Sequence, residues 1–145
     1  MTDPLTPRPA DTASLPRRFA ARVIDGVLVA VILFGLGSIF GFGYGWLVLG
    51  AVVTLAYFAL FDALAGTTPG KRLLKLRVES LGGGRPALSR AVAREAFMVA
   101  GAVPYVGPLL ALALWIWILI SIRSSPLGQG VHDRWAGGTR VLLSA

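Results

Sequence analysis

The sequence RRFAARVIDG, residues 17–26, places charged side chains at the start of a long run of apolar residues. No charged residue occurs between Asp25 and Asp62, and none occurs between Glu95 and Arg123. Both intervals exceed the roughly 20 residues that cross a hydrocarbon core about 30 Å thick. Because 55% of the chain is hydrophobic and only 14% is charged, these intervals predict an integral membrane protein.

The first uncharged interval predicts two helices, because a helix satisfies its backbone polar groups within lipid. One helix is expected over 17–40 and a second over 46–65, separated by the glycine- and aromatic-rich turn GFGYGW. This turn has no Lys or Arg, whereas basic residues are frequent before the first helix and over 66–95. The distribution of positive charge predicts that the N-terminus and the segment 66–95 lie in the cytoplasm.

The last apolar stretch, 97–122, is either one span or a hairpin of two. The sequence VPYVGP, residues 103–108, interrupts it with two prolines and a glycine. A hairpin bent at this point returns the arginines that follow to the cytoplasm, as the charge distribution requires. We therefore predict an all-α membrane protein with four transmembrane or membrane-embedded helices, the alternative being three, and with both termini in the cytoplasm.

The polar ends of the chain predict a tail and a small β-like element. Residues 1–16, MTDPLTPRPADTASLP, have the composition of a disordered tail rather than of a secretory signal, so the membrane domain is expected over 17–145. KLRVES, which precedes a glycine turn, and GGTRVLL, near the C-terminus, each read as a short strand. Pairing the two strands would draw GQGVHDRWAGG toward TPGKR in a small cytoplasmic β-like element.

Four segments in this order resemble the RDD family of small bacterial membrane proteins. They are RRFAARVIDG, FDALAGTTPGKRLLKLRV, ALSRAVAREA and GQGVHDRWAGGTRVLL, and the resemblance covers almost everything after the tail. The arginine and two aspartates that name the family fall on Arg18, Asp25 and Asp133, whereas Arg22 stands where the family is commonly apolar. Some family members are described as cation/proton antiporters. The resemblance therefore implies a multi-pass protein of the bacterial plasma membrane.

Arg18, Arg22 and Asp25 share roughly one face of the first predicted helix, because their spacing is four and three residues. Asp62 is expected at a similar depth on the second helix. A charge at mid-bilayer costs about 2.5–3.5 kcal/mol on insertion scales, so such residues usually pair inside the protein. We expect Asp25 to pair with Arg18 or Arg22. This cluster is either a static ion pair, a titrating acid on an ion or proton path, or a partner-binding site.

Other polar residues are interpreted more simply. A basic segment after the second helix is expected to contact anionic lipid headgroups, with these residues taking part: Lys71, Arg72, Lys75, Arg77 and Arg94. The alternative is that TTPGKRLLK binds a phosphate, although it lacks the spacing of a phosphate-binding loop. His132 beside Asp133 is the only histidine, and a lone histidine is more often a structural hydrogen-bonding group than a metal ligand.

Two classes of function remain open. No Ser-His-Asp order, carboxylate pair or metal-ligand spacing supports catalysis, so we predict that the protein is not an enzyme and needs no cofactor or metal. The net charge is +7, but the basic residues flank apolar runs, and this arrangement does not indicate nucleic-acid binding. The first class is a small secondary transporter that exchanges a monovalent cation for protons and works as a homo-oligomer. The second is a non-transporting accessory or scaffold subunit that binds a membrane partner.

Overall fold

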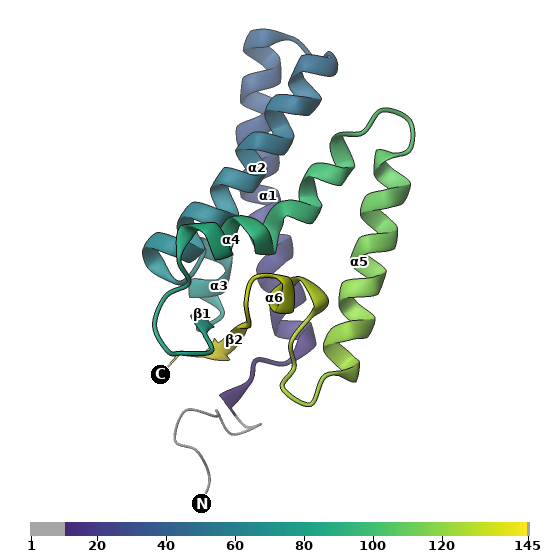
Figure 1. Ribbon diagram of the computed structural model, residues 1–145. Coiled ribbons are helices and arrows are strands. Elements are labelled where there is room, and N and C mark those ends of the chain that lie inside the picture. Colours follow the sequence, from purple (N-terminus) through teal and green to yellow (C-terminus); the bar gives the residue numbers. More distant parts are fainter. Residues whose placement is uncertain (1–10, 145) are drawn as a thin grey trace, which may run out of the picture.

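The computed structural model describes residues 11–144 (Figure 1). Three long helices stand side by side, and short helices and a two-stranded sheet gather at one end of them (Figure 1). In chain order the elements are α1 (Leu15–Phe40), α2 (Tyr44–Ala65), α3 (Pro69–Leu73), β1 (Leu76–Ser80), α4 (Leu88–Glu95), the 3-10 helix η2 (Ala96–Ala102), α5 (Gly107–Ser124), α6 (Val131–Trp135) and β2 (Thr139–Leu143).

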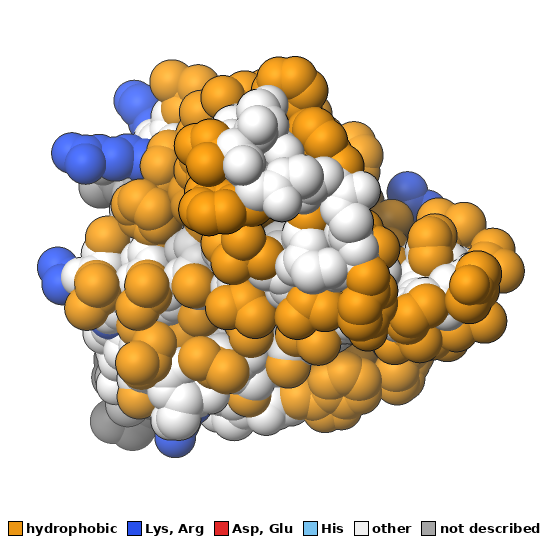
Figure 2. Space-filling view, turned by 90° about the horizontal axis from the view of Figure 1, so that it is seen from above, with side chains coloured by type: hydrophobic (Ala, Val, Ile, Leu, Met, Phe, Trp, Pro, Cys, Tyr) orange, Lys and Arg blue, Asp and Glu red, His pale blue; other side chains and the backbone are white. Residues whose placement is uncertain are grey.

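Within 11–144, three helices are long and apolar enough to cross a membrane: α1, α2 and α5. Most of their large apolar side chains are exposed, as expected for helices whose surroundings are lipid. Figure 2 views the molecule from the end that carries the α1–α2 turn, where hydrophobic side chains dominate and Lys and Arg appear only at the edge. The first two predicted helices are confirmed, and the chain is a multi-pass membrane protein.

The predicted hairpin at Pro104 is present, but its first arm is not a spanning helix. Gly107 N–H donates to Val103 O across the turn at 2.8 Å, and Tyr105 adopts a φ of 64°. The first arm consists of α4 and η2, which have 8 and 7 residues. At about 1.5–2.0 Å per residue this arm is shorter than a hydrocarbon core of about 30 Å. Three helices are thus long enough to span the membrane, and the fourth membrane-embedded helix that the sequence predicts is not confirmed, because this arm consists of two short helices that pack on α2 (Figure 1).

The predicted pairing of the two polar strands is confirmed. β1 and β2 are antiparallel, with Leu76 opposite Leu143 and Ser80 opposite Thr139. The two-stranded sheet lies beside α3 and α6 at one end of the long helices (Figure 1). We call α3, α6 and the sheet the basal layer. The chain enters α1 and leaves β2 at this same end (Figure 1).

Part of the predicted tail belongs to the fold. Thr12 forms a β-bridge with Leu142, and Ala13 N–H donates to Val141 O at 3.1 Å. Ala13 is buried, and α1 already begins at Leu15. Thr12 and Ala13 can pair with β2 because that strand leaves one edge free of β1. The rest of the predicted tail, 1–10, lies outside the described residues.

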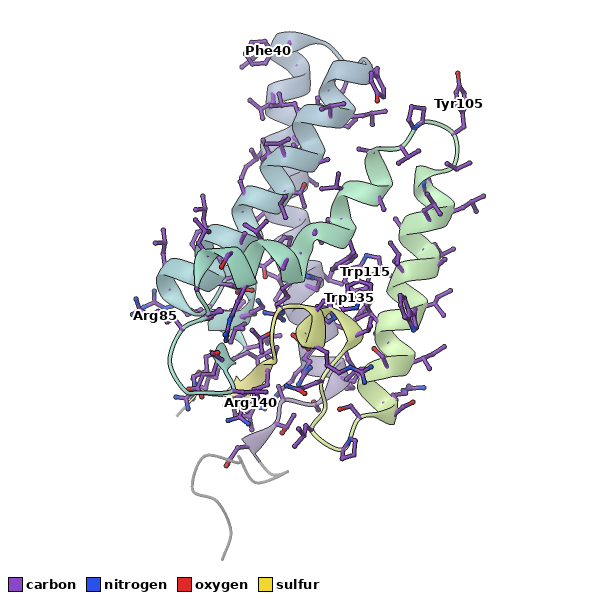
Figure 3. The ribbon with its side chains drawn as sticks, in the orientation of Figure 1. Phe40, Arg85, Tyr105, Trp115, Trp135 and Arg140 are labelled. Carbon is purple, nitrogen blue, oxygen red and sulfur yellow. The ribbon has the colours of Figure 1, made fainter. Side chains whose placement is uncertain are left out.

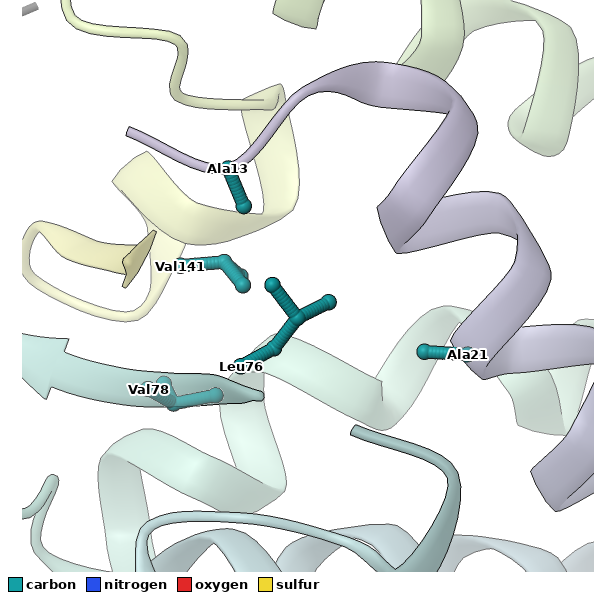
Figure 4. Packing of buried hydrophobic residues seen from close by; sticks show 5 residues of the cluster. All are labelled: Ala13, Ala21, Leu76, Val78 and Val141. Carbon is teal, nitrogen blue, oxygen red and sulfur yellow. The ribbon is translucent and has the colours of Figure 1, made fainter. Parts of the chain in front are cut away.

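A small apolar core joins the basal layer to α1. Figure 4 shows Leu76 and Val78 of β1 facing Val141 of β2, with Ala13 and Ala21 closing the cluster. Alternate residues of β1 are buried, which is the period-2 pattern of a strand with one covered face. This core holds the sheet against the start of α1, where the charged residues of the first helix lie.

Candidate functional site

Asp62 joins three elements through buried ion pairs. It lies near the end of α2, and both of its oxygens accept from Lys71 Nζ of α3, at 2.6 and 2.9 Å. Arg94 Nη1 of α4 donates to the same carboxylate at 2.9 Å. Asp62 is fully buried, so these pairs are formed out of water. Burial lowers the pKa of the Lys71 ammonium, and the charge of Asp62 opposes that shift.

Asp133 joins the basal layer to α4. Arg94 Nε lies 2.8 Å from Asp133 Oδ1, so one guanidinium bridges Asp62 and Asp133. Asp133 also accepts from Gly130 N–H and from the Thr139 hydroxyl, both at 3.0 Å. Burial works to raise the pKa of Asp133, but Arg94, then His132 and Arg18, outweigh it and lower the pKa to about 2. This aspartate therefore remains ionised.

Arg22 pairs with Glu95, a residue outside the cluster that the sequence predicts. Arg22 Nη2 lies 2.5 Å from Glu95 Oε2, and its guanidinium carbon lies 4.0 Å from the centroid of the Phe58 ring. Glu95 is fully buried at the end of α4. Burial acts to raise the pKa of Glu95, whereas Arg22 and then Arg94 lower it to about 2. The sequence signal that could have placed Glu95 in the cluster is its position as the last charged residue before the apolar stretch 97–122.

Asp25 is held by neutral donors. Its Oδ1 accepts from Gly70 N–H at 2.7 Å and from the Tyr57 hydroxyl at 2.9 Å, and its Oδ2 accepts from the Thr68 hydroxyl. Within 11–144, no Lys or Arg lies within ion-pair distance of it. The expected pairing of Asp25 with an arginine of α1 is therefore wrong. The start of α3 approaches α1 closely, so that Thr68 and Gly70 supply two of the donors, and Tyr57 of α2 supplies the third.

Arg18 lies against Asp133 rather than Asp25. Its Nη1 is 3.9 Å from Asp133 Oδ2, and the same side chain donates to the backbone oxygens of Ala13 and Val141, each at 3.2 Å. Of the three residues that name the family, two therefore come together and Asp25 stands apart. We refer below to these seven residues as the ion network: Arg18, Arg22, Lys71, Arg94, Asp62, Glu95 and Asp133.

The expected headgroup contacts divide into two groups. Lys71 and Arg94 are buried in the ion network, where carboxylates from neighbouring elements pair with them, so they do not belong to the exposed basic surface. Arg72, Lys75 and Arg77 are exposed, and Arg77 pairs with Glu79 at 2.8 Å. The sequence pattern could not separate these groups, because both belong to one basic run.

His132 is buried beside the network. Burial lowers its pKa from 6.5 to about 4, against the opposing charge of Asp133 3.7 Å away. Its ring also packs on Phe97 with centroids 5.8 Å apart. Among the described residues, no group of His, Asp and Glu has the arrangement of a metal site. His132 is therefore a neutral packing residue at physiological pH.

This burial predicts a pH dependence of stability. Between pH 6.5 and about 4 an unfolded chain binds a proton at His132 that the folded chain does not bind. Lowering the pH through this window should therefore reduce the free energy of unfolding by about 3 kcal/mol. Thermal unfolding of detergent-purified protein at several pH values measures the effect. His132→Gln should show a flatter dependence over the same window, and an unchanged slope would contradict the assignment.

The fold and the ion network define a multi-pass membrane protein with a charged layer at one end of its spans. The family model of the RDD family matches residues 12–137, and the chain belongs to this family. The match begins at Thr12, which forms a β-bridge with Leu142 of β2. A search of the curated proteins and a search of the solved structures gave no match.

Proposed function

We propose that the protein is a non-transporting accessory or scaffold subunit of the membrane in which the ion network is structural. One observation carries the proposal: the strong pairs connect different elements. Arg22 of α1 binds Glu95 of α4, Lys71 of α3 binds Asp62 of α2, and Arg94 of α4 binds Asp133 of α6. These pairs hold the basal layer and α4 to the ends of the spans.

The geometry of the pairs supports a fixed role. Three acids of the network have no exposed surface, and their strongest contacts are 2.5–2.9 Å long. Removing one partner of a buried pair leaves an uncompensated charge, which costs about 3–5 kcal/mol. If a carboxylate of the network carried ions, it would have to release its basic partner in every transport cycle. Each release would require this free energy. The network is therefore better suited to hold the elements together than to carry ions.

The test is a transport assay on the unmodified protein. The protein is reconstituted in vesicles containing a pH-sensitive dye, and sodium, potassium and lithium pulses are applied. The accessory role predicts no proton flux above that of vesicles without protein. A cation-dependent flux would overturn the proposal. Co-purification of a stoichiometric membrane partner under mild detergent would support it.

The proposed location is the bacterial plasma membrane with both termini in the cytoplasm. The support is the exposed basic residues at the basal end, Arg72, Lys75 and Arg77, against a turn at 41–43 that carries no charge. Anionic lipid headgroups should contact these exposed side chains, since each basic residue near the surface is worth about 1 kcal/mol.

Cysteine labelling tests this orientation. The native chain has no cysteine, so Ser14→Cys, Ser144→Cys and Gly43→Cys each introduce a single reporter. In intact cells an impermeant thiol reagent should label the cysteine at 43 and leave those at 14 and 144 unlabelled. Permeabilised cells provide the control, because all three positions should then react. Labelling of the cysteine at 144 in intact cells would contradict the proposal that both termini lie on the cytoplasmic side of the membrane.

A second candidate function is cation/proton exchange, and one observation favours it. Asp25 is a fully buried carboxylate within the long helix α1 that no cation of the described chain neutralises. An intramembrane acid of this kind is a common feature of proton pathways. Three spanning helices hardly enclose a path alone, so this function would require a homo-oligomer.

Asp25→Asn separates the two candidates. An asparagine can still accept from Gly70 N–H and contact the Thr68 hydroxyl, so stability should fall by only about 1–2 kcal/mol. If the protein transports, proton flux should be abolished, because an amide does not titrate. Tyr57→Phe is the matched control, since it removes one hydrogen bond to Asp25 and keeps the acid. Flux that survives Asp25→Asn would exclude Asp25 as the proton carrier.

A further inference from the structure

A cavity of about 60 Å³ lies between α1, α5 and the ion network. Five of its lining residues are basic or histidine: Arg18, Arg22, Lys71, Arg94 and His132. No carboxylate is among the lining residues. A water needs about 10–15 Å³ of such space, so the cavity has room for a group about the size of a phosphate.

The network leaves a positive charge beside this cavity. Its four basic side chains meet three carboxylates, those of Asp62, Glu95 and Asp133. The one other buried acid among residues 11–144, Asp25, is bound by neutral donors and does not line the cavity. An uncompensated charge is unfavourable away from water, so an anion in the cavity would stabilise the arrangement.

Three buried polar atoms of the lining residues have no hydrogen-bond partner. They are Nη1 of Arg22, Nε of Arg94 and Nδ1 of His132, of which only Nε of Arg94 lies at an ion-pair distance from an acid, 2.8 Å from Asp133 Oδ1. The His132 side chain is 7% exposed, so solvent hardly reaches it. The ring lies at the cavity wall with Phe97, which also lines the cavity. A guanidinium N–H donates to anionic oxygens, and a neutral imidazole can donate from one ring nitrogen.

Apolar side chains of the spanning helices also line the cavity. Phe19 of α1 is 53% exposed, and Leu119 and Ile122 of α5 also line the cavity. Trp115 of α5, labelled in Figure 3, lies 5.6 Å from the guanidinium carbon of Arg22, measured to its ring centroid. The site thus combines cationic side chains with apolar side chains of two spanning helices. That combination fits an amphiphile better than a free ion.

We propose that this cavity binds the phosphate of an anionic phospholipid, whose acyl chains lie along α1 and α5. Arg22 and His132 supply the unpartnered polar atoms, and Phe19 and Leu119 contact the first carbons of the lipid. The site differs from the exposed basic residues at the basal surface, because it encloses one headgroup within the fold. The proposal does not depend on whether the protein transports ions.

The first test compares three probes on the unmodified protein. Delipidated protein in a neutral detergent is titrated with phosphatidylglycerol, phosphatidylcholine or inorganic phosphate, and binding is followed by native mass spectrometry and thermal unfolding. We expect phosphatidylglycerol to bind roughly tenfold tighter than phosphatidylcholine, which corresponds to one or two extra charge contacts. Equal binding of the two lipids would overturn the anionic site. Inorganic phosphate that stabilises as strongly as phosphatidylglycerol would overturn the lipid as occupant.

The second test fills the cavity without changing a charge. Leu119→Trp places a larger ring at the lining of the cavity and should abolish the preference for phosphatidylglycerol. Ile120→Trp is the matched control, because Ile120 is exposed on the same helix and does not line the cavity. The preference should persist in that variant. A preference that survives Leu119→Trp, or that is lost equally in both variants, would overturn the location.

Discussion

Replacing Asp62 with asparagine should lower the free energy of unfolding by about 3–5 kcal/mol, because it leaves a buried ammonium and half of a buried guanidinium without their counter-charge. Lys71 has no other acid within ion-pair distance among residues 11–144, whereas Arg94 keeps Asp133. Most of the loss should therefore arise at Lys71. The measurement is unfolding of the purified protein in mixed micelles of increasing denaturing detergent.

Two further variants separate charge burial from a general loss of packing. Glu79→Gln breaks the pair with Arg77, whose side chain is 47% exposed, and it should change stability by less than about 1 kcal/mol. The double change Asp62→Asn with Lys71→Met removes the buried charge at both ends and should recover much of the stability. If the double variant is no more stable than Asp62→Asn alone, the pair does not account for the loss.

Sequence reasoning predicted the elements that depend on local pattern. Uninterrupted apolar runs gave α1 and α2, and Pro104 with Gly107 marked the turn before α5. The pairing of β1 with β2 was also predictable, because two polar strands at one end of a membrane domain have few other partners. Each of these features rests on residues that are near one another in sequence, or on backbone groups that must be paired.

The partners within the ion network were not predictable in the same way. Glu95 and Arg94 are adjacent in sequence, yet Arg94 bridges Asp62 and Asp133 while Glu95 binds Arg22. The side chains of consecutive helical residues point in different directions, so a rotation of α4 decides which acid each arginine meets. That rotation depends on how α4 packs against α2. Spacing along α1 suggested Arg18 or Arg22 as the partner of Asp25. This was wrong because spacing within one helix cannot show that a later segment, at Gly70, packs against Asp25.

Gly70 allows α3 to pack closely against α1. Its substitution should lower the free energy of unfolding as much as the loss of Asp62 does. A Cβ built at Gly70 would collide with the backbone oxygen of Ala21 and would lie 2.9 Å from the carboxyl carbon of Asp25. The backbone oxygen cannot move away as a flexible side chain could. α3 would have to shift, and the hydrogen bond from Gly70 N–H to Asp25 would lengthen with it.

Gly70→Ala should therefore reduce the free energy of unfolding by about 3–5 kcal/mol, since overpacking costs about 1–3 kcal/mol and loss of a hydrogen bond to a buried charge adds about 1.5–3 kcal/mol. Gly26→Ala is the matched control, because Gly26 follows Asp25 in α1 and a Cβ there would meet nothing within 4 Å. It should leave stability unchanged or raise it by up to about 1 kcal/mol, because alanine is the better helix former. The same unfolding measurement compares the two variants. Equal stability of Gly70→Ala and Gly26→Ala would show that α3 does not approach α1 this closely, and the neutral environment of Asp25 would lose its structural basis.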